Sequence, residues 1–271
     1  MGFRLNAYLD RIRLSNVPDG LAGLRALQES HMRAIPFENI DPLLGRVPSL
    51  DPKSLSDKLL ARERGGYCFE HNRLFGHALE ALGYAPRTLL ARVRNGAPEG
   101  GARTHQAFEV TVEAARWLAD TGFGGHGALH PVGLDEPGPQ VLPNGAYRVV
   151  RDAVAGETVV ERQAGDVWIS LYGFDGHTAR RIDLEAANFL CASWDGAPFK
   201  ANLMLALHGP DGRRAMFNRA LTLGMPPETE TRVIDRFEDF ARVLREEFRL
   251  DVDHADLAAV WAKIETAPTR R

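Results

Sequence analysis

The residues whose types and spacing suit covalent chemistry lie between Arg64 and Asn72, in the stretch RGGYCFEHN. Two consecutive glycines let the backbone turn sharply, and Cys68 follows them where a helix is expected to begin. At a helix start, the helix dipole and the free backbone N–H groups favour a thiolate over a thiol. The same N–H groups could stabilise the oxyanion that forms when a thioester is attacked. The segment therefore favours Cys68 as a covalent nucleophile.

The alternative for Cys68 is a buried cysteine that packs as a small hydrophobic residue, which is the usual role of cysteine. The other cysteine, Cys191, has apolar neighbours and no glycine turn, so packing is the better interpretation there. Two cysteines in 271 residues are too few for a disulfide framework. Such sparse use is typical of a reducing cytosol, and we expect a cytoplasmic protein.

A cysteine nucleophile needs a base, and the chain has nine histidines. His71 and His77 follow Cys68 on the same expected helix, where His71 is close enough to be a cap or a packing partner. His105 opens an expected strand after a glycine-rich loop, and Asp120 ends the next strand. If these strands form a hairpin, Asp120 could hold the tautomer of the His105 imidazole. Spacing alone does not select this trio, because an ordinary polar strand residue is the commoner role for a histidine such as His105.

The glycine-rich segment 122–127 reads GFGGHG and matches the G-x-G-x-x-G pattern of dinucleotide-binding folds. Such a fold requires a helix to begin there, whereas Pro131, Pro137 and Pro139 follow and no βαβ unit is visible. We reject that interpretation and keep a weaker one, in which the loop lets a phosphate-bearing ligand reach backbone N–H groups. Neither a CxxC nor an HExxH spacing occurs, so no metal site is expected.

The overall charge excludes one class of partner. The formal net charge is -3, whereas a nucleic-acid-binding protein usually carries a clear basic excess. We therefore expect no nucleic-acid partner. No apolar run approaches the length of a membrane-spanning helix, and the first residues do not resemble a signal peptide, so we expect no membrane association.

The elements that must position these residues fall into three groups. Helical spacing marks residues 21–27, 55–59 and 68–82, with a start signal at Asp51-Pro52 and a stop signal at Gly83. Short strands are then expected at residues 88–93, 107–112, 115–118, 147–150, 158–162 and 167–172. The last third combines strands at 203–207 and 215–223, around a hairpin turn at residues 211–212, with helices at 234–248 and 255–264. This order predicts an α+β fold.

Three segments of the chain resemble the arylamine N-acetyltransferases. They are IPFENI at residues 35–40, the segment around Cys68, and Thr104-His105 followed by DTGFG at residues 120–124. The resemblance implies an N-terminal helical bundle over residues 1–85, a central antiparallel β-barrel over 86–190 and a C-terminal α/β lid over 191–271. Its core would be similar to that of papain-like and transglutaminase-like cysteine enzymes.

The resemblance also implies a catalytic triad of Cys68, His105 and Asp120 and a ping-pong reaction. Cys68 would take an acetyl group from acetyl-coenzyme A as a thioester. An arylamine, arylhydroxylamine or hydrazine would then receive the acetyl group, while His105 moves the proton. Acetyl-coenzyme A is then a co-substrate and no metal takes part. The resemblance allows a homo-oligomer.

Five binding residues follow from the same resemblance. Phe37 and Phe123 match aromatic positions that line the family's acceptor pocket, and plain core packing is an equal alternative for Phe37. Gly124 and Gly125 match the loop near the coenzyme A entrance, and Thr104 is included as a neighbour of the site.

One segment departs from the family pattern, and three other functions compete. Trp194 and Asp195 stand where small hydroxyl residues are expected beside the acceptor pocket, which leaves the range of acceptors open. An amide synthase of secondary metabolism, or a transglutaminase-like thiol hydrolase with water as acceptor, would use the same triad. A non-catalytic binding module would not need all three triad residues, so their presence argues against it.

Overall fold

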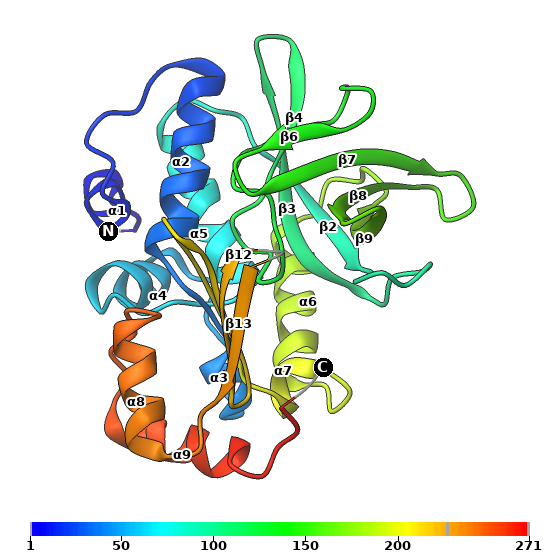
Figure 1. Cartoon of the computed structure of the whole chain (residues 1–271). Helices are drawn as coiled ribbons and strands as arrows, with labels where there is room; N and C mark the ends of the chain where they lie inside the picture. The colour runs from blue at the N-terminus through cyan, green and yellow to red at the C-terminus, as the bar shows by residue number, and fades with distance from the viewer. Residues whose placement is uncertain (1, 226–227, 270–271) are drawn as a thin grey trace.

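The computed structural model describes residues 2–225 and 228–269, and its elements are mainly helical at first, then stranded, then mixed (Figure 1). The first part contains α1 (Leu5–Ile12), α2 (Gly20–Ala34), β1 (Phe37–Glu38), α3 (Ile40–Leu43), α4 (Pro52–Leu55), the π-helix η1 (Ser56–Ala61) and α5 (Cys68–Ala81). No helix in the two described ranges is both long and apolar enough to cross a lipid bilayer.

The helix that carries Cys68 starts and stops as the sequence predicts. The Glu70 carboxylate accepts a hydrogen bond from the backbone N–H of Tyr67 at 3.1 Å, which satisfies a donor at the helix start. Phe75, Leu79 and their neighbours on one face of α5 pack into the core with α1, α2 and β3. Gly83 then adopts a φ of 84°, a left-handed conformation that ends helices.

Eight strands form an antiparallel sheet in the order β5-β4-β3-β2-β9-β8-β7-β6, which curls into a nearly closed barrel (Figure 1). Their bounds are β2 (Arg87–Val93), β3 (Arg103–Val112), β4 (Ala115–Ala119), β5 (Val132–Gly133), β6 (Gln140–Leu142), β7 (Gly145–Asp152), β8 (Glu157–Ala164) and β9 (Val167–Phe174). The side-chain amide of Gln140 bridges the two edge strands, because it both accepts from and donates to the Gly133 backbone, at 2.7 and 2.8 Å. The predicted antiparallel barrel is confirmed in this nearly closed form.

The β3–β4 hairpin places the second and third candidate residues. Glu113 and Ala114 form its tip, both with positive φ, which is the conformation of a tight type I′ turn. Phe108 pairs with Ala119, so His105 on β3 and Asp120 at the end of β4 lie at the same end of the hairpin. The hairpin on which the sequence argument depended is therefore present.

A second antiparallel sheet has the order β1-β10-β11-β12-β13, and it includes a strand from the helical part. The C-terminal elements are α6 (Arg181–Ser193), α7 (Pro198–Ala201), β10 (Met204–Gly209), β11 (Gly212–Phe217), β12 (Ala220–Met225), β13 (Glu228–Val233), α8 (Phe237–Glu246) and α9 (His254–Ile264). Residues of α8 and α9 share an apolar core with β10, β11 and β12.

The single strand predicted over residues 215–223 is wrong. Asn218 has a φ of 50° and starts a turn, so two strands occupy this stretch. The Asn218 side chain accepts the Leu203 N–H at 2.9 Å, which fixes the turn against the neighbouring strand. The helices predicted over 55–59 and 234–248 also differ. Leu55 ends α4 and the rest of the first stretch lies in the π-helix η1, while the second stretch contains the shorter α8.

The three-part division at residues 85 and 190 remains a prediction. The second of these limits falls inside α6, and β1 joins a sheet whose other strands all follow residue 203. Elements of the first and last parts are thus joined by backbone pairing between Phe37 and Ala206.

Candidate active site

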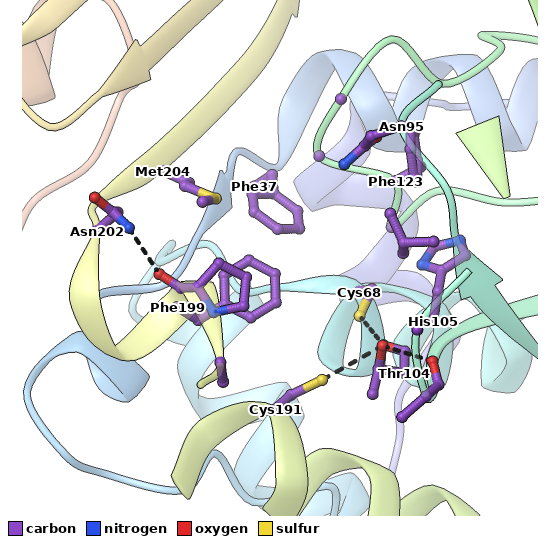
Figure 2. Close-up of a pocket in the computed structure, with 18 of the residues that line it drawn as sticks. Phe37, Cys68, Asn95, Thr104, His105, Phe123, Cys191, Phe199, Asn202 and Met204 are labelled. Atoms are coloured by element: carbon purple, nitrogen blue, oxygen red, sulfur yellow. Dashed lines mark hydrogen bonds between the residues drawn. The ribbon is translucent and has the colours of Figure 1, made fainter. Parts of the chain in front are cut away.

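Cys68 lies on the wall of a cavity of about 450 Å³ (Figure 2). Seven of the eight residues predicted from the sequence line this cavity, namely Phe37, Cys68, Thr104, His105, Phe123, Gly124 and Gly125. Further lining residues come from the C-terminal third and include Leu190, Cys191, Trp194, Phe199 and Met204. Among the described residues, no group of three or more His, Cys, Asp and Glu side chains could hold a metal ion.

The Cys68 thiol is buried, with 4% of the residue exposed. Burial raises the pKa of this thiol well above its usual value, although the backbone N–H groups of Gln106 and Phe69 act in the opposite direction. The start of a helix alone therefore does not make Cys68 a thiolate. Its reactivity depends on a neighbouring base that can take the proton.

His105, the predicted base, is hydrogen-bonded to Asp120. His105 is 2% exposed on β3, and its Nε2 lies 2.7 Å from Oδ2 of Asp120. Because Nε2 is committed to the carboxylate, Nδ1 is the ring nitrogen that can accept a proton. His105 and Cys68 line the same cavity (Figure 2).

Asp120 is buried and receives four hydrogen bonds, which explains why it stays charged. Its Oδ2 accepts from His105 and from the Tyr172 hydroxyl at 2.9 Å. Its Oδ1 accepts from the Asn72 side-chain amide and the Gly122 N–H, each at 2.9 Å. Burial alone would raise the pKa of Asp120, but His105, Asn72 and the Gly122 N–H together hold it below its usual value.

Two amide side chains fix the backbone around Asp120. Gln28 of α2 accepts the Asp120 N–H at 3.1 Å. Asn72 also donates to the Gln106 carbonyl at 2.5 Å and accepts the Thr121 N–H at 3.0 Å. Since Asn72 lies one turn after Cys68 on α5, it ties the cysteine helix to the β3–β4 hairpin.

Sequence reasoning did not identify Asn72, Tyr172 or Gln28 as site residues. Asn72 had a signal, because a residue four positions after Cys68 lies on the same helix face. Tyr172 and Gln28 are separated from Asp120 by 52 and 92 positions, and no local pattern links them to it.

Cys191 provides a second thiol in the cavity. Its Sγ lies 3.5 Å from the Thr104 carbonyl oxygen, and the Cys68 Sγ lies 3.6 Å from the same oxygen (Figure 2). Burial raises the pKa of Cys191 to about 12, so this side chain remains a thiol. The prediction that Cys191 is a packed cysteine holds for its burial, but its position beside Cys68 was not foreseen.

Aromatic rings form much of the cavity wall. The Phe37 ring stacks on His71, with ring centroids 6.3 Å apart, and also lines the cavity. The Phe123 ring stands edge-on to His105, with centroids 5.3 Å apart. Trp194 is 59% exposed at the cavity margin, while Asp195 forms an ion pair with Lys200. Phe37 therefore packs against a buried ring and also lines the cavity, and its contact with an acceptor stays a prediction.

The glycines of the loop after β4 are required by close packing. A Cβ on Gly122 would lie 2.7 Å from the Cα and carbonyl oxygen of Cys68. A Cβ on Gly124 would lie 2.6 Å from the Phe37 ring. The loop is thus pressed against the cysteine and one aromatic wall, which only glycine permits.

Known proteins match almost the whole chain. A family model described as N-acetyltransferase matches residues 20–257. An arylamine N-acetyltransferase / N-hydroxyarylamine O-acetyltransferase from Salmonella typhimurium is 36% identical over 277 residues, which cover 97% of each chain. The chain belongs to the arylamine N-acetyltransferase family. The resemblance noted in the sequence is therefore confirmed, and so is membership of an acyltransferase family.

Solved structures of arylamine N-acetyltransferases have the same fold. The Salmonella typhimurium structure has a TM-score of 0.89 at 35% identity, covering 95% of this chain and 97% of that one. The Mycobacterium marinum arylamine N-acetyltransferase in complex with CoA has a TM-score of 0.90 at 32% identity, covering 96% and 99%. The arrangement expected from the resemblance, with a cysteine helix packed on a barrel, is thus the fold of the arylamine N-acetyltransferase family.

Proposed function

We propose that this chain is an acetyl-coenzyme A-dependent N-acetyltransferase that passes an acetyl group through a Cys68 thioester to arylamines, arylhydroxylamines or hydrazines. One observation carries the proposal. Cys68 and His105 line one cavity, and His105 is hydrogen-bonded to Asp120, which has the donors that hold its pKa below the usual value. A nucleophile, a base and an orienting carboxylate are the parts that acyl transfer requires.

In the first half-reaction, Cys68 attacks the acetyl thioester. The thiol proton moves to Nδ1 of His105 as Sγ bonds to the acetyl carbon, and Asp120 stabilises the resulting imidazolium. The carbon–sulfur bond to coenzyme A then breaks, and the leaving thiolate takes the proton from His105. Free coenzyme A and an acetylated Cys68 result.

Backbone N–H groups provide the electrostatic support for this step. The N–H groups of Phe69 and Gln106 both lower the pKa of the Cys68 thiol, so they lie where they favour negative charge at the sulfur. Phe69 is the second residue of α5, where backbone donors have no partner within the helix. These donors would also stabilise the oxyanion of the tetrahedral intermediate.

In the second half-reaction, the amine nitrogen attacks the Cys68 thioester. His105 takes a proton from the nitrogen, the bond between Sγ and the acetyl carbon breaks, and Sγ recovers a proton from His105. The cavity supports a flat apolar acceptor, because Phe37, Phe123 and Phe199 line it. Trp194 at the margin limits acceptors that extend beyond the cavity.

The test is the intact mass of the protein after incubation with acetyl-coenzyme A alone. We expect the wild type to gain one acetyl group and Cys68→Ala to gain none. The matched control is Cys191→Ala, which should still be acetylated, because it keeps the nucleophile and loses only the neighbouring thiol. Adding an arylamine or a hydrazine should then return the wild type to its original mass.

Three other outcomes would contradict the proposal. If the folded wild type gains no mass, acetyl-coenzyme A is not the donor. If the acetyl group disappears in water without an amine, the chain is a thiol hydrolase. If only acyl chains bound to a carrier protein acylate Cys68, the chain is an amide synthase.

A further inference from the structure

The two cysteines of the chain meet on the wall of the catalytic cavity. Cys68 begins α5, Cys191 lies near the end of α6, and both are free thiols. Each thiol contacts the Thr104 carbonyl oxygen, at 3.6 Å from the Sγ of Cys68 and 3.5 Å from that of Cys191 (Figure 2). A carbonyl oxygen has two lone pairs, so it can accept both S–H groups at once. The two sulfurs are therefore no further apart than two such contacts laid end to end.

The helix that carries Cys191 is fixed against the residue that precedes Cys68. The Tyr67 hydroxyl donates to the Asn188 carbonyl at 3.1 Å, and the Asn188 side chain donates to the Pro48 carbonyl at 2.9 Å. Asn188 and Cys191 are three positions apart on α6, so they share one face of that helix. Tyr67, Cys68 and Cys191 also belong to one buried apolar cluster. The packing thus holds the two thiols at the same place.

The two thiols differ in their surroundings. After burial, the Cys191 sulfur has the largest effect on the pKa of the Cys68 thiol, and it raises that pKa further. The N–H groups of Phe69 and Gln106 lower the pKa of Cys68, and His105 lines the same cavity. Cys191 has a pKa of about 12, because it is buried. Since the thiolate is the nucleophile, Cys68 attacks first and Cys191 is a second thiol beside it.

We propose that Cys68 and Cys191 form a modification site, which a small disulfide compound oxidises to an intramolecular disulfide. The cavity of about 450 Å³ admits such a compound. The bonded sulfurs of a disulfide are about 2.05 Å apart. Both side chains line the cavity, which gives their Cα–Cβ bonds room to rotate toward this distance. A bridged Cys68 could not accept an acetyl group; that consequence rests on the proposed function, whereas the bridge requires only the two thiols.

The oxidation consists of two thiol–disulfide exchanges. In the first, the Cys68 proton moves to His105 and Sγ bonds to one sulfur of the compound. The S–S bond of the compound breaks, and the departing thiolate takes the proton from His105. In the second, the Cys191 sulfur attacks the Cys68 sulfur of the mixed disulfide, and the second thiolate departs with the Cys191 proton. Two protein thiols lose two electrons in total, and one small disulfide is reduced to two thiols.

The position of Cys191 decides the second exchange. An external thiol has to diffuse to the mixed disulfide, whereas Cys191 is already beside it. Intramolecular attack by a well-placed group is faster than attack from solution, which offsets the high pKa of this thiol. Without Cys191, the mixed disulfide on Cys68 should therefore persist.

The test follows the intact mass of the protein after treatment with bis(2-hydroxyethyl) disulfide, with no acyl donor present. We expect the wild type to become two hydrogen atoms lighter and to carry no adduct. Proteolysis without reductant should then release a peptide pair that links Cys68 to Cys191. Cys191→Ser should stop at one mercaptoethanol adduct on Cys68, and Cys191→Ala replaces it if the serine variant does not fold. Ser193→Ala, on the same helix, keeps both thiols and should form the bridge as the wild type does.

Dithiothreitol should return the bridged wild type to its original mass. If the wild type keeps a mercaptoethanol adduct on either cysteine, Cys191 does not reach the mixed disulfide and the proposal is overturned. It is also overturned if the bridge joins two chains, or if the folded protein does not react. Because the mass is measured without acetyl-coenzyme A, these outcomes are independent of the acetylation test. A chain that is acetylated but forms no bridge loses only this inference, and a chain that forms the bridge but is not acetylated loses only the proposed function.

Discussion

Replacing Asp120 with asparagine should invert the tautomer of His105. Oδ1 of Asp120 accepts from Asn72 and from the Gly122 N–H, so an asparagine would keep its oxygen at this position. Its amide nitrogen would then face His105 Nε2 and could only donate to it. The ring proton would move to Nδ1, and that nitrogen could no longer accept the Cys68 proton.

The expected loss follows from the role of the base. General-base catalysis contributes about 10²- to 10⁴-fold, which corresponds to about 3 to 5 kcal/mol of activation free energy. Because burial raises the pKa of the Cys68 thiol, the reaction depends on a base, and almost all of this contribution should be lost in Asp120→Asn. The assay is the rate at which Cys68 gains an acetyl group, followed by rapid quenching and intact-mass measurement.

A variant that leaves the catalytic site untouched separates chemistry from folding. Asp135→Asn removes an exposed carboxylate paired with Arg116 and should acylate at the wild-type rate. Circular dichroism and the melting temperature must show that Asp120→Asn is folded. If the folded variant acylates Cys68 within fivefold of the wild type, Asp120 does not orient the base and the proposed triad is refuted.

Three further predictions follow from the same contacts. Tyr172→Phe should slow acylation by about tenfold, less than Asp120→Asn, because it removes only one of four donors to Asp120; single-turnover rates measure this. Gly122→Ala should lower both the melting temperature and the acylation rate, because its Cβ would meet the Cys68 backbone. The control is Gly101→Ala at the same cavity, whose Cβ would meet nothing within 4 Å and which should behave as the wild type. Burial lowers the pKa of His71 to about 4, so the unfolded chain binds more protons between about pH 6.5 and 4. Urea denaturation should therefore show that the free energy of unfolding decreases as the pH falls from about 6.5 to about 4, by up to about 1.4 kcal/mol per pH unit for this histidine.

The sequence predicted those site residues whose positions follow from local structure. Cys68 was found from a glycine turn before a helix, and His105 and Asp120 were linked by a hairpin between adjacent strands. Short-range rules govern both features. The choice of His105 among nine histidines still needed the family resemblance, because spacing does not report which side chains converge.

The contacts to Asp120 depend on how distant elements pack. Tyr172 reaches Asp120 from β9 and Gln28 reaches it from α2, and neither is close to Asp120 in sequence. Cys191 was interpreted correctly as buried, but its place beside Cys68 depends on how α6 packs against β3, which no residue pattern within α6 reveals.

Two glycines and two buried ion pairs together hold the turn that precedes Cys68. Gly65 and Gly66 lie directly against other groups, since a Cβ on Gly66 would lie 2.7 Å from the Glu70 carboxylate. The Gly66 carbonyl accepts the Glu38 N–H at 2.7 Å, which fixes the turn before the helix. Two ion pairs, Arg64–Glu38 and Lys58–Glu70, each 2.7 Å long, hold the flanking chain from both sides.

These buried charges need one another, because removing one partner of such a pair costs about 3–5 kcal/mol. The same interactions that satisfy them also hold the turn that delivers Cys68 to the helix start. We therefore infer that the charged residues of the segment position Cys68 and take no direct part in the proposed chemistry. In the proposed mechanism the acid–base chemistry belongs to His105, which lines the cavity with Cys68 and is oriented by Asp120.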